Sequence, residues 1–189
     1  MTAQWIILGL IVALALYAIV IYNRLVRARQ MVQEGWSGIE VQLKKRANLI
    51  PNLVNAVKGY MRHERELLEK VTELRSQALS MERATPAERS RIEQQISSLL
   101  GRITVAMENY PDLKANQNII DLQRQLAQIE HDIQMARRYY NGTVRENNIL
   151  VESFPSNLIA QLFRFEKAEY FELEDPADRA VPKVDLSPA

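Results

Sequence analysis

The pattern of hydrophobic and polar positions changes sharply at residue 22. Residues 5–22 are apolar throughout, contain neither a charged residue nor a proline, and begin and end with Trp5 and Tyr22. A helix of this length spans roughly 27 Å, close to the hydrocarbon thickness of a bilayer, and aromatic rings favour its two interfaces. We therefore predict a transmembrane helix over residues 5–22, with Leu10 and Leu14 in its interior and residues 1–4 as a short tail.

Two alternatives to a membrane anchor remain open for this segment. Residues 13–15 read Ala-Leu-Ala, which would suit cleavage of a signal peptide. A positively charged start is missing, however, and apolar residues continue past the cut. A buried core helix is disfavoured because the segment has no polar stripe.

Beyond residue 23, apolar residues recur at spacings of three and four, which is typical of helices. One stripe includes Leu43 and Ile50 and continues from Leu53 to Ala78, so the membrane helix is expected to run on into a long first helix. Proline has no backbone N–H and clashes with the preceding turn, so Pro51 is expected to kink or briefly break this helix.

Three further helices are predicted. The second begins with Thr85 as N-cap, Pro86 in the first turn and Glu88 completing a capping box, and it ends near Asn109. The third follows residues 110–112 and runs to about residue 151. Its apolar series alternates spacings of three and four, the pattern of bundle packing and coiled coils: Ile119, Leu122, Leu126, Ile129, Ile133, Ala136 and Tyr140. A short fourth helix starts at residue 156 and is expected to dock through Leu158, Ile159, Leu162, Phe163 and Phe165.

These elements predict an all-α protein, in which a transmembrane helix continues into an elongated, antiparallel bundle of three to four helices. The bundle is assigned to residues 23–175. The tail over residues 176–189 contains prolines and little to bury, and it is expected to be mobile.

Charge is distributed unevenly along the chain. Residues 23–47 carry six basic and two acidic side chains, a local sum of +4, and residues 166–179 carry six acidic and two basic, a local sum of −4. Arg24, Arg27 and Arg29 follow the apolar segment directly, so the positive-inside rule places the N-terminus outside and the bundle in the cytoplasm, with these arginines near lipid headgroups. The total of +1 argues against a nucleic-acid partner.

Catalytic and metal-binding patterns are missing from the sequence. The chain has no cysteine, and neither of its histidines, His63 and His131, follows a glutamate by three residues as a bundle di-metal site requires. No phosphate-binding glycine loop or nucleophile motif occurs. We therefore expect a non-enzymatic protein without a cofactor or metal.

Several polar residues lie on the predicted bundle helices, where they need a structural or functional reason. Two readings stay open: hydrogen bonds and ion pairs within the bundle, or a polar surface for self-association or a partner. The candidates are Lys44, Arg46, Asn52, Asn116, Arg138 and Asn141.

Motifs along nearly the whole chain resemble the LemA family. They occupy residues 22–26, 36–46, 48–54, 57–60, 63–64, 110–116, 136–141, 154–160 and 170–172. The resemblance implies a bacterial single-pass membrane protein with a cytoplasmic helical bundle and no known enzymatic activity. It also implies relatives in magnetosome membrane formation and members encoded beside a membrane metalloprotease.

Two functions follow as hypotheses. The first is a non-catalytic scaffold of the bacterial inner membrane, which self-assembles into a homo-oligomer or holds membrane partners. The second is an adaptor or regulator of a membrane protease or signalling system, with the acidic residues 166–179 and an exposed face of the bundle as its docking surface. Under the second hypothesis, deleting residues 166–189 should leave the fold intact.

Overall fold

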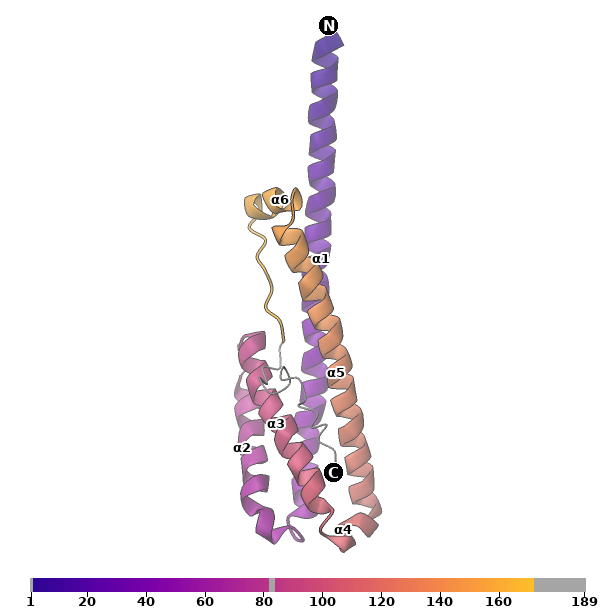
Figure 1. Ribbon diagram of the computed structural model, residues 1–189, viewed down its shortest axis with the longest axis vertical. Coiled ribbons are helices and arrows are strands. Elements are labelled where there is room, and N and C mark those ends of the chain that lie inside the picture. The colour runs from indigo at the N-terminus through magenta and orange to yellow at the C-terminus, as the bar shows by residue number, and fades with distance from the viewer. Residues whose placement is uncertain (1, 82–83, 172–189) are drawn as a thin grey trace, which may run out of the picture.

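The computed structural model describes residues 2–81 and 84–171, and it shows an elongated helical bundle from which one helix projects (Figure 1). Every regular element in these residues is helical, which confirms the all-α prediction. In chain order the elements are α1 (Thr2–Val57), the 3-10 helix η1 (Arg62–Glu64), α2 (Arg65–Ser80), α3 (Pro86–Met107), α4 (Pro111–Ala115), α5 (Gln117–Glu152) and α6 (Ser156–Leu162).

Helix α1 is continuous through Pro51, so a break in the helix at this proline, one of the two outcomes expected there, is wrong. A proline leaves the carbonyl four residues earlier without its helical donor. That carbonyl belongs to Ala47, and Arg75 of α2 donates to it from Nε at 2.5 Å. Ile50 and Leu53 beside the proline are fully buried. A side chain from a neighbouring helix and packing on both sides therefore keep this backbone helical.

The apolar stripe from Leu53 to Ala78 belongs to two helices rather than one. Helix α1 ends at Val57, and the chain turns through η1 into α2. Val57 and Met61 are both fully buried, so the four-residue spacing continues across the turn. Periodicity alone could not reveal this turn, and Gly59 is its local signal in the sequence.

The start of α3 is formed as predicted. The Glu88 amide donates to Thr85 Oγ1 at 3.3 Å, and the Thr85 amide donates to Glu88 Oε2 at 2.9 Å. Helix α3 ends at Met107, near the expected position. Pro111 opens the short α4 instead of the long third helix, which begins only after Asn116.

The core runs along the whole bundle in three clusters. The cluster farthest from the N-terminus joins α1, α2, α3 and α5, the middle one joins α1 and α5, and the third joins α1 to α6. Within the apolar series predicted for α5, every seventh residue is buried, and the intervening Leu122, Ile129 and Ala136 are half-buried. The buried members of this predicted series are Ile119, Leu126, Ile133 and Tyr140.

The C-terminal part differs from the expectation in two ways. Of the predicted docking residues of α6, Phe165 is buried and Ile159 is half-buried, but Leu158, Leu162 and Phe163 are more than half exposed. Residues 166–171 then return along the bundle in extended form; we call this segment the strap (Figure 1). The expected mobile tail, residues 176–189, lies outside the described residues.

Helices α1 and α5 approach each other closely at Gly35. A Cβ atom at Gly35 would lie 3.1 Å from the Tyr140 Cα atom, a backbone atom that cannot move without displacing α5. Gly35→Ala is therefore expected to destabilise the protein by roughly 1–2 kcal/mol in urea unfolding, despite the better helix propensity of alanine.

Gly38 is the matched control, since a Cβ atom there meets nothing within 4 Å. Gly38→Ala should raise the free energy of unfolding by about 0.5–1 kcal/mol. Equal effects of the two substitutions would contradict a tight crossing at Gly35.

Candidate functional site

The N-terminal third of α1 stands free of the bundle (Figure 1). In the described residues, α1 is the one helix long and apolar enough to cross a membrane, and its most apolar window is only 6% buried. Trp5, Leu10 and Leu14 are all well exposed. A core helix of a soluble protein would be covered, so the exposure of this segment favours contact with lipid.

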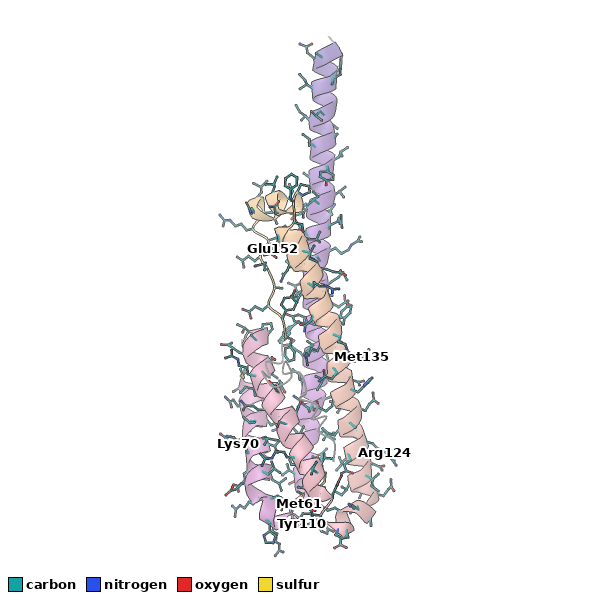
Figure 2. The ribbon with its side chains drawn as sticks, viewed as in Figure 1. Met61, Lys70, Tyr110, Arg124, Met135 and Glu152 are labelled. Atoms are coloured by element: carbon teal, nitrogen blue, oxygen red, sulfur yellow. The ribbon has the colours of Figure 1, made fainter. Side chains whose placement is uncertain are left out.

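The junction between this segment and the bundle is aromatic and basic. Tyr22 makes edge contacts with Phe163 and Phe165, at centroid distances of 4.8 and 5.7 Å. The Arg29 guanidinium lies 5.1 Å from the centroid of the Phe165 ring. Arg24 and Arg27 are exposed on the same stretch of α1. Figure 2 places Glu152, the last residue of α5, toward this junction and Met61 and Tyr110 at the opposite, distal end.

Arg46 is completely buried and joins three helices. Its Nη1 atom donates to Ser97 Oγ of α3 at 2.5 Å and to Glu130 Oε1 of α5 at 2.7 Å. Its Nη2 atom donates to Glu93 Oε2 of α3 at 2.5 Å. Glu93 is also buried and accepts from Arg89 Nε at 2.9 Å. We call these five side chains the Arg46 network; Lys44, two residues earlier, is exposed.

The candidate asparagines occupy three different environments. Asn52 is exposed on α1. Asn116 caps α5, because its Oδ1 atom accepts from the Asn118 amide at 3.0 Å. Asn141 binds the strap at Phe171, accepting from its amide at 2.9 Å and donating to its carbonyl at 3.2 Å. Arg138 is exposed beside Asn141 on an open groove of the α5 surface.

Comparison with known proteins identifies the relatives of this chain. The sequence pattern that defines the LemA family matches residues 35–186. The chain belongs to the LemA family. It is 28% identical to Protein LemA of Metamycoplasma hominis over 141 residues, which cover 74% of this chain and 63% of that protein.

The LemA-family chain is also similar to magnetosome proteins. It is 24% identical over 181 residues to Magnetosome protein MamQ 2 of Paramagnetospirillum magneticum, covering 82% of this chain and 66% of that protein. Magnetosome protein MamQ of Magnetospirillum gryphiswaldense is 23% identical over the same length. The chain thus spans a little under two thirds of the length of these relatives. The family match begins after the apolar segment, so the anchor is inferred from the chain itself.

The LemA-family bundle holds its strap through side chains that sequence reasoning missed. Asn148 accepts from the Ala168 amide at 2.8 Å and donates to the Ala168 carbonyl at 3.0 Å, and Asn147 donates to the Glu166 carbonyl at 3.3 Å. Asn148 lies seven residues after Asn141, on the same face of α5. Each of the two side-chain amides donates one hydrogen bond to the strap backbone and accepts one from it, as a neighbouring β-strand would. The seven-residue spacing of these two asparagines is the signal in the sequence that could have predicted this contact.

Tyr140 ties the strap to the LemA-family core and gives it a pH dependence. Its hydroxyl donates to the Glu169 carbonyl at 2.7 Å, and burial, with a contribution from the Glu169 charge, raises the pKa of Tyr140 to about 12. Because the folded pKa exceeds the ordinary value of 10.0, this stabilisation is complete below pH 10 and is lost as pH rises toward 12.

Thermal unfolding measured across this range should therefore show a falling melting temperature. Tyr140→Phe should weaken the alkaline dependence, whereas the exposed neighbour Tyr139→Phe should retain it. An identical alkaline profile in both variants would contradict the assignment to Tyr140.

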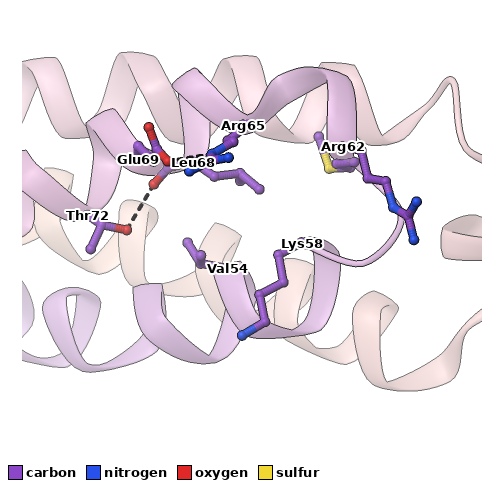
Figure 3. Close-up of a pocket in the computed structure, with 8 residues that line it drawn as sticks. Val54, Lys58, Arg62, Arg65, Leu68, Glu69 and Thr72 are labelled. Carbon is purple, nitrogen blue, oxygen red and sulfur yellow. Dashed lines mark hydrogen bonds and ion pairs between the residues drawn. The ribbon is translucent and has the colours of Figure 1, made fainter.

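An open groove of about 630 Å³ lies between α1 and α2 at the distal end of the LemA-family bundle (Figure 3). Its charged lining consists of Lys58, Arg62, Arg65 and Glu69, and Arg65 pairs with Glu69 at 2.7 Å. Among residues 2–81 and 84–171, no group of three or more histidine, cysteine or acidic side chains could hold a metal ion. The groove thus presents positive charge without a recognisable acid–base pair or metal site.

Proposed function

We propose that this chain is a non-catalytic, membrane-anchored scaffold of the bacterial inner membrane. The observation that carries the proposal is the continuity of α1, which joins an exposed apolar segment to the bundle core without a break. Because one helix forms both the apolar segment and part of the bundle core, no flexible joint separates the two at the membrane surface. The similarity to magnetosome proteins favours a role at a membrane over a role in solution.

A continuous helix fixes the bundle relative to the apolar segment. Residues 23–57 of α1 extend about 50 Å beyond the apolar segment, so the bundle would hold its distal end at a set height. Anchoring also confines copies to a surface, which raises their effective concentration and allows weak lateral contacts to suffice for assembly. We propose that the LemA-family bundle forms a homo-oligomer or holds membrane-protein partners in this way.

Crosslinking in native membranes, followed by native mass spectrometry of detergent-extracted full-length protein, tests the scaffold. We expect oligomers or a reproducible membrane-protein partner. A strict monomer at every concentration, without any crosslinked partner, would reject the proposal.

The proposed orientation has a separate test. The chain has no cysteine, so single cysteines can be labelled selectively with a membrane-impermeant maleimide in spheroplasts. Gln4→Cys should react from outside, and Ser76→Cys, exposed on α2, should react only after lysis. The reverse pattern would place the bundle outside.

The second candidate function is an adaptor for a membrane protease or signalling system. Its proposed acidic surface must be redrawn, because residues 166–171 form the strap and Phe171 is buried. A deletion that starts at residue 166 would therefore damage the fold, contrary to the sequence-based expectation. The appropriate deletion is residues 172–189, which should abolish a specific crosslink at an unchanged melting temperature. Unchanged crosslinks would count against the adaptor.

A further inference from the structure

An unexplained apolar surface surrounds α6. Phe154 is 79% exposed, Leu158 56%, Leu162 72% and Phe163 54%. Phe154, Leu158 and Leu162 follow one another at intervals of four residues, and Ala160 and Ser156 on the other side of α6 are buried. Clustered large apolar side chains of this kind mark contact with a partner or a membrane. We call the four exposed residues the α6 apolar face.

The position of α6 indicates what covers this face. Ala160 and Phe165 pack against Ile21 and Leu25 of α1, and Phe163 contacts Tyr22. These α1 residues lie where the apolar segment ends and the arginines begin. Figure 1 shows α6 at the end of the bundle from which the N-terminal part of α1 projects. The α6 apolar face is therefore next to the expected water–lipid boundary.

The surrounding charges fit the same boundary. Arg24, Arg27 and Arg29 lie just past Tyr22, and Arg164 follows Phe163; all four are exposed. Segments that lie in a membrane interface combine apolar side chains facing the acyl chains with arginine or lysine at headgroup level. The Tyr22 ring suits the headgroup level of this zone, and phenylalanines such as Phe154 and Phe163 are typical of the apolar face of an interfacial segment.

We propose that α6 is a second membrane contact, which lies in the lipid interface and inserts Phe154, Leu158, Leu162 and Phe163 into the leaflet that α1 leaves at Tyr22. The inference rests on the proposed anchoring through residues 5–22. It adds a new consequence: two points of contact, rather than one helix, set the tilt of the bundle and restrict its rotation about α1.

The test uses full-length protein in vesicles of phosphatidylethanolamine and phosphatidylglycerol. Single cysteines at Leu158 and Leu162 are labelled with an environment-sensitive fluorophore. Quenching by lipid-borne nitroxides is compared with quenching by aqueous iodide. Val105→Cys is the matched control, because Val105 is a 65% exposed apolar residue on α3, toward the distal end. We expect a ratio of lipid to aqueous quenching several-fold higher at Leu158 and Leu162 than at Val105.

A label at Leu10 separates the two levels of the proposal. Lipid quenching at Leu10 with only aqueous quenching at Leu162 would overturn the interfacial role of α6 and leave the anchor standing. Aqueous quenching at Leu10 would reject the anchor itself. Protection of Leu162 from both quenchers would assign the face to a protein contact and likewise overturn the inference.

A second variant tests the insertion directly. Leu158→Glu with Leu162→Glu places charges at exposed positions, so the fold should be retained by circular dichroism. A fluorophore at Phe154→Cys should then lose its lipid quenching. Lipid quenching that persists in this variant would contradict insertion of the α6 apolar face.

Discussion

Arg46→Met is expected to lower the free energy of unfolding by about 3–5 kcal/mol, because it leaves the buried Glu93 carboxylate and the half-buried Glu130 carboxylate without their main partner. Glu93 is 5% exposed and would retain Arg89, while Glu130 and Ser97 would lose their link to α1. A small domain has roughly 5–15 kcal/mol in total, so the loss is a large share of the stability. Urea unfolding of the detergent-solubilised full-length chain, followed by circular dichroism, measures it.

Lys44→Met is the matched control. Lys44 is exposed on the same helix, and its replacement should change the stability by no more than about 0.5 kcal/mol. A loss below about 1 kcal/mol in Arg46→Met would show that water replaces the guanidinium, contrary to a dry network.

A double variant separates two effects of Arg46→Met. One is the loss of the attraction between Arg46 and Glu93, and the other is the cost of leaving the Glu93 carboxylate buried without that partner. Arg46→Met with Glu93→Leu removes both buried charges, and Arg89 keeps its hydrogen bond to the Ala78 carbonyl. This variant should be more stable than Arg46→Met alone, since a buried ion pair replaced by apolar groups is often neutral. If adding Glu93→Leu lowers the free energy of unfolding further, the Arg46 network stabilises the fold by more than the mutual compensation of buried charges.

The Arg46 network also shows where sequence reasoning ends. Periodicity and capping chemistry predicted the heptad positions of α5 and the start of α3, because these depend on neighbours within about seven residues. Arg46 is 47 residues from Glu93 and 84 from Glu130. Such pairing depends on helix register, which a single pattern does not encode. The continuous helix at Pro51 was missed for the same reason, since the donor to Ala47 comes from Arg75 on another helix.

Phe171→Ala is expected to cost about 3–5 kcal/mol, the usual range for removing a buried phenylalanine. Phe171 is 3% exposed, and its ring lies 5.9 Å from the Trp36 ring and within the cluster that includes Tyr140. With Trp5→Phe as background, Trp36 is the only tryptophan left. Its emission should shift to the red in Phe171→Ala, and urea unfolding should begin at lower denaturant. Val105→Ala, at a 65% exposed position on α3, should leave both unchanged.

The strap can respond to this substitution in two ways, which hydrogen exchange distinguishes. If the strap is part of the cooperative fold, Phe171→Ala speeds exchange throughout α5, including amides far from residue 171. If the strap opens locally, only its own amides lose protection, chiefly Ala168, which bonds to Asn148.

The spacing of the strap contacts favours the cooperative response. Asn141, Asn148 and Tyr140 hold residues 168–171 at three points along two turns of α5, and Phe165 fixes the other end beside α6. A segment fixed at both ends cannot peel away without also loosening the packing of α6 on α1. Exchange that changes only at residues 166–171 in Phe171→Ala would show instead that the strap and the helices unfold independently.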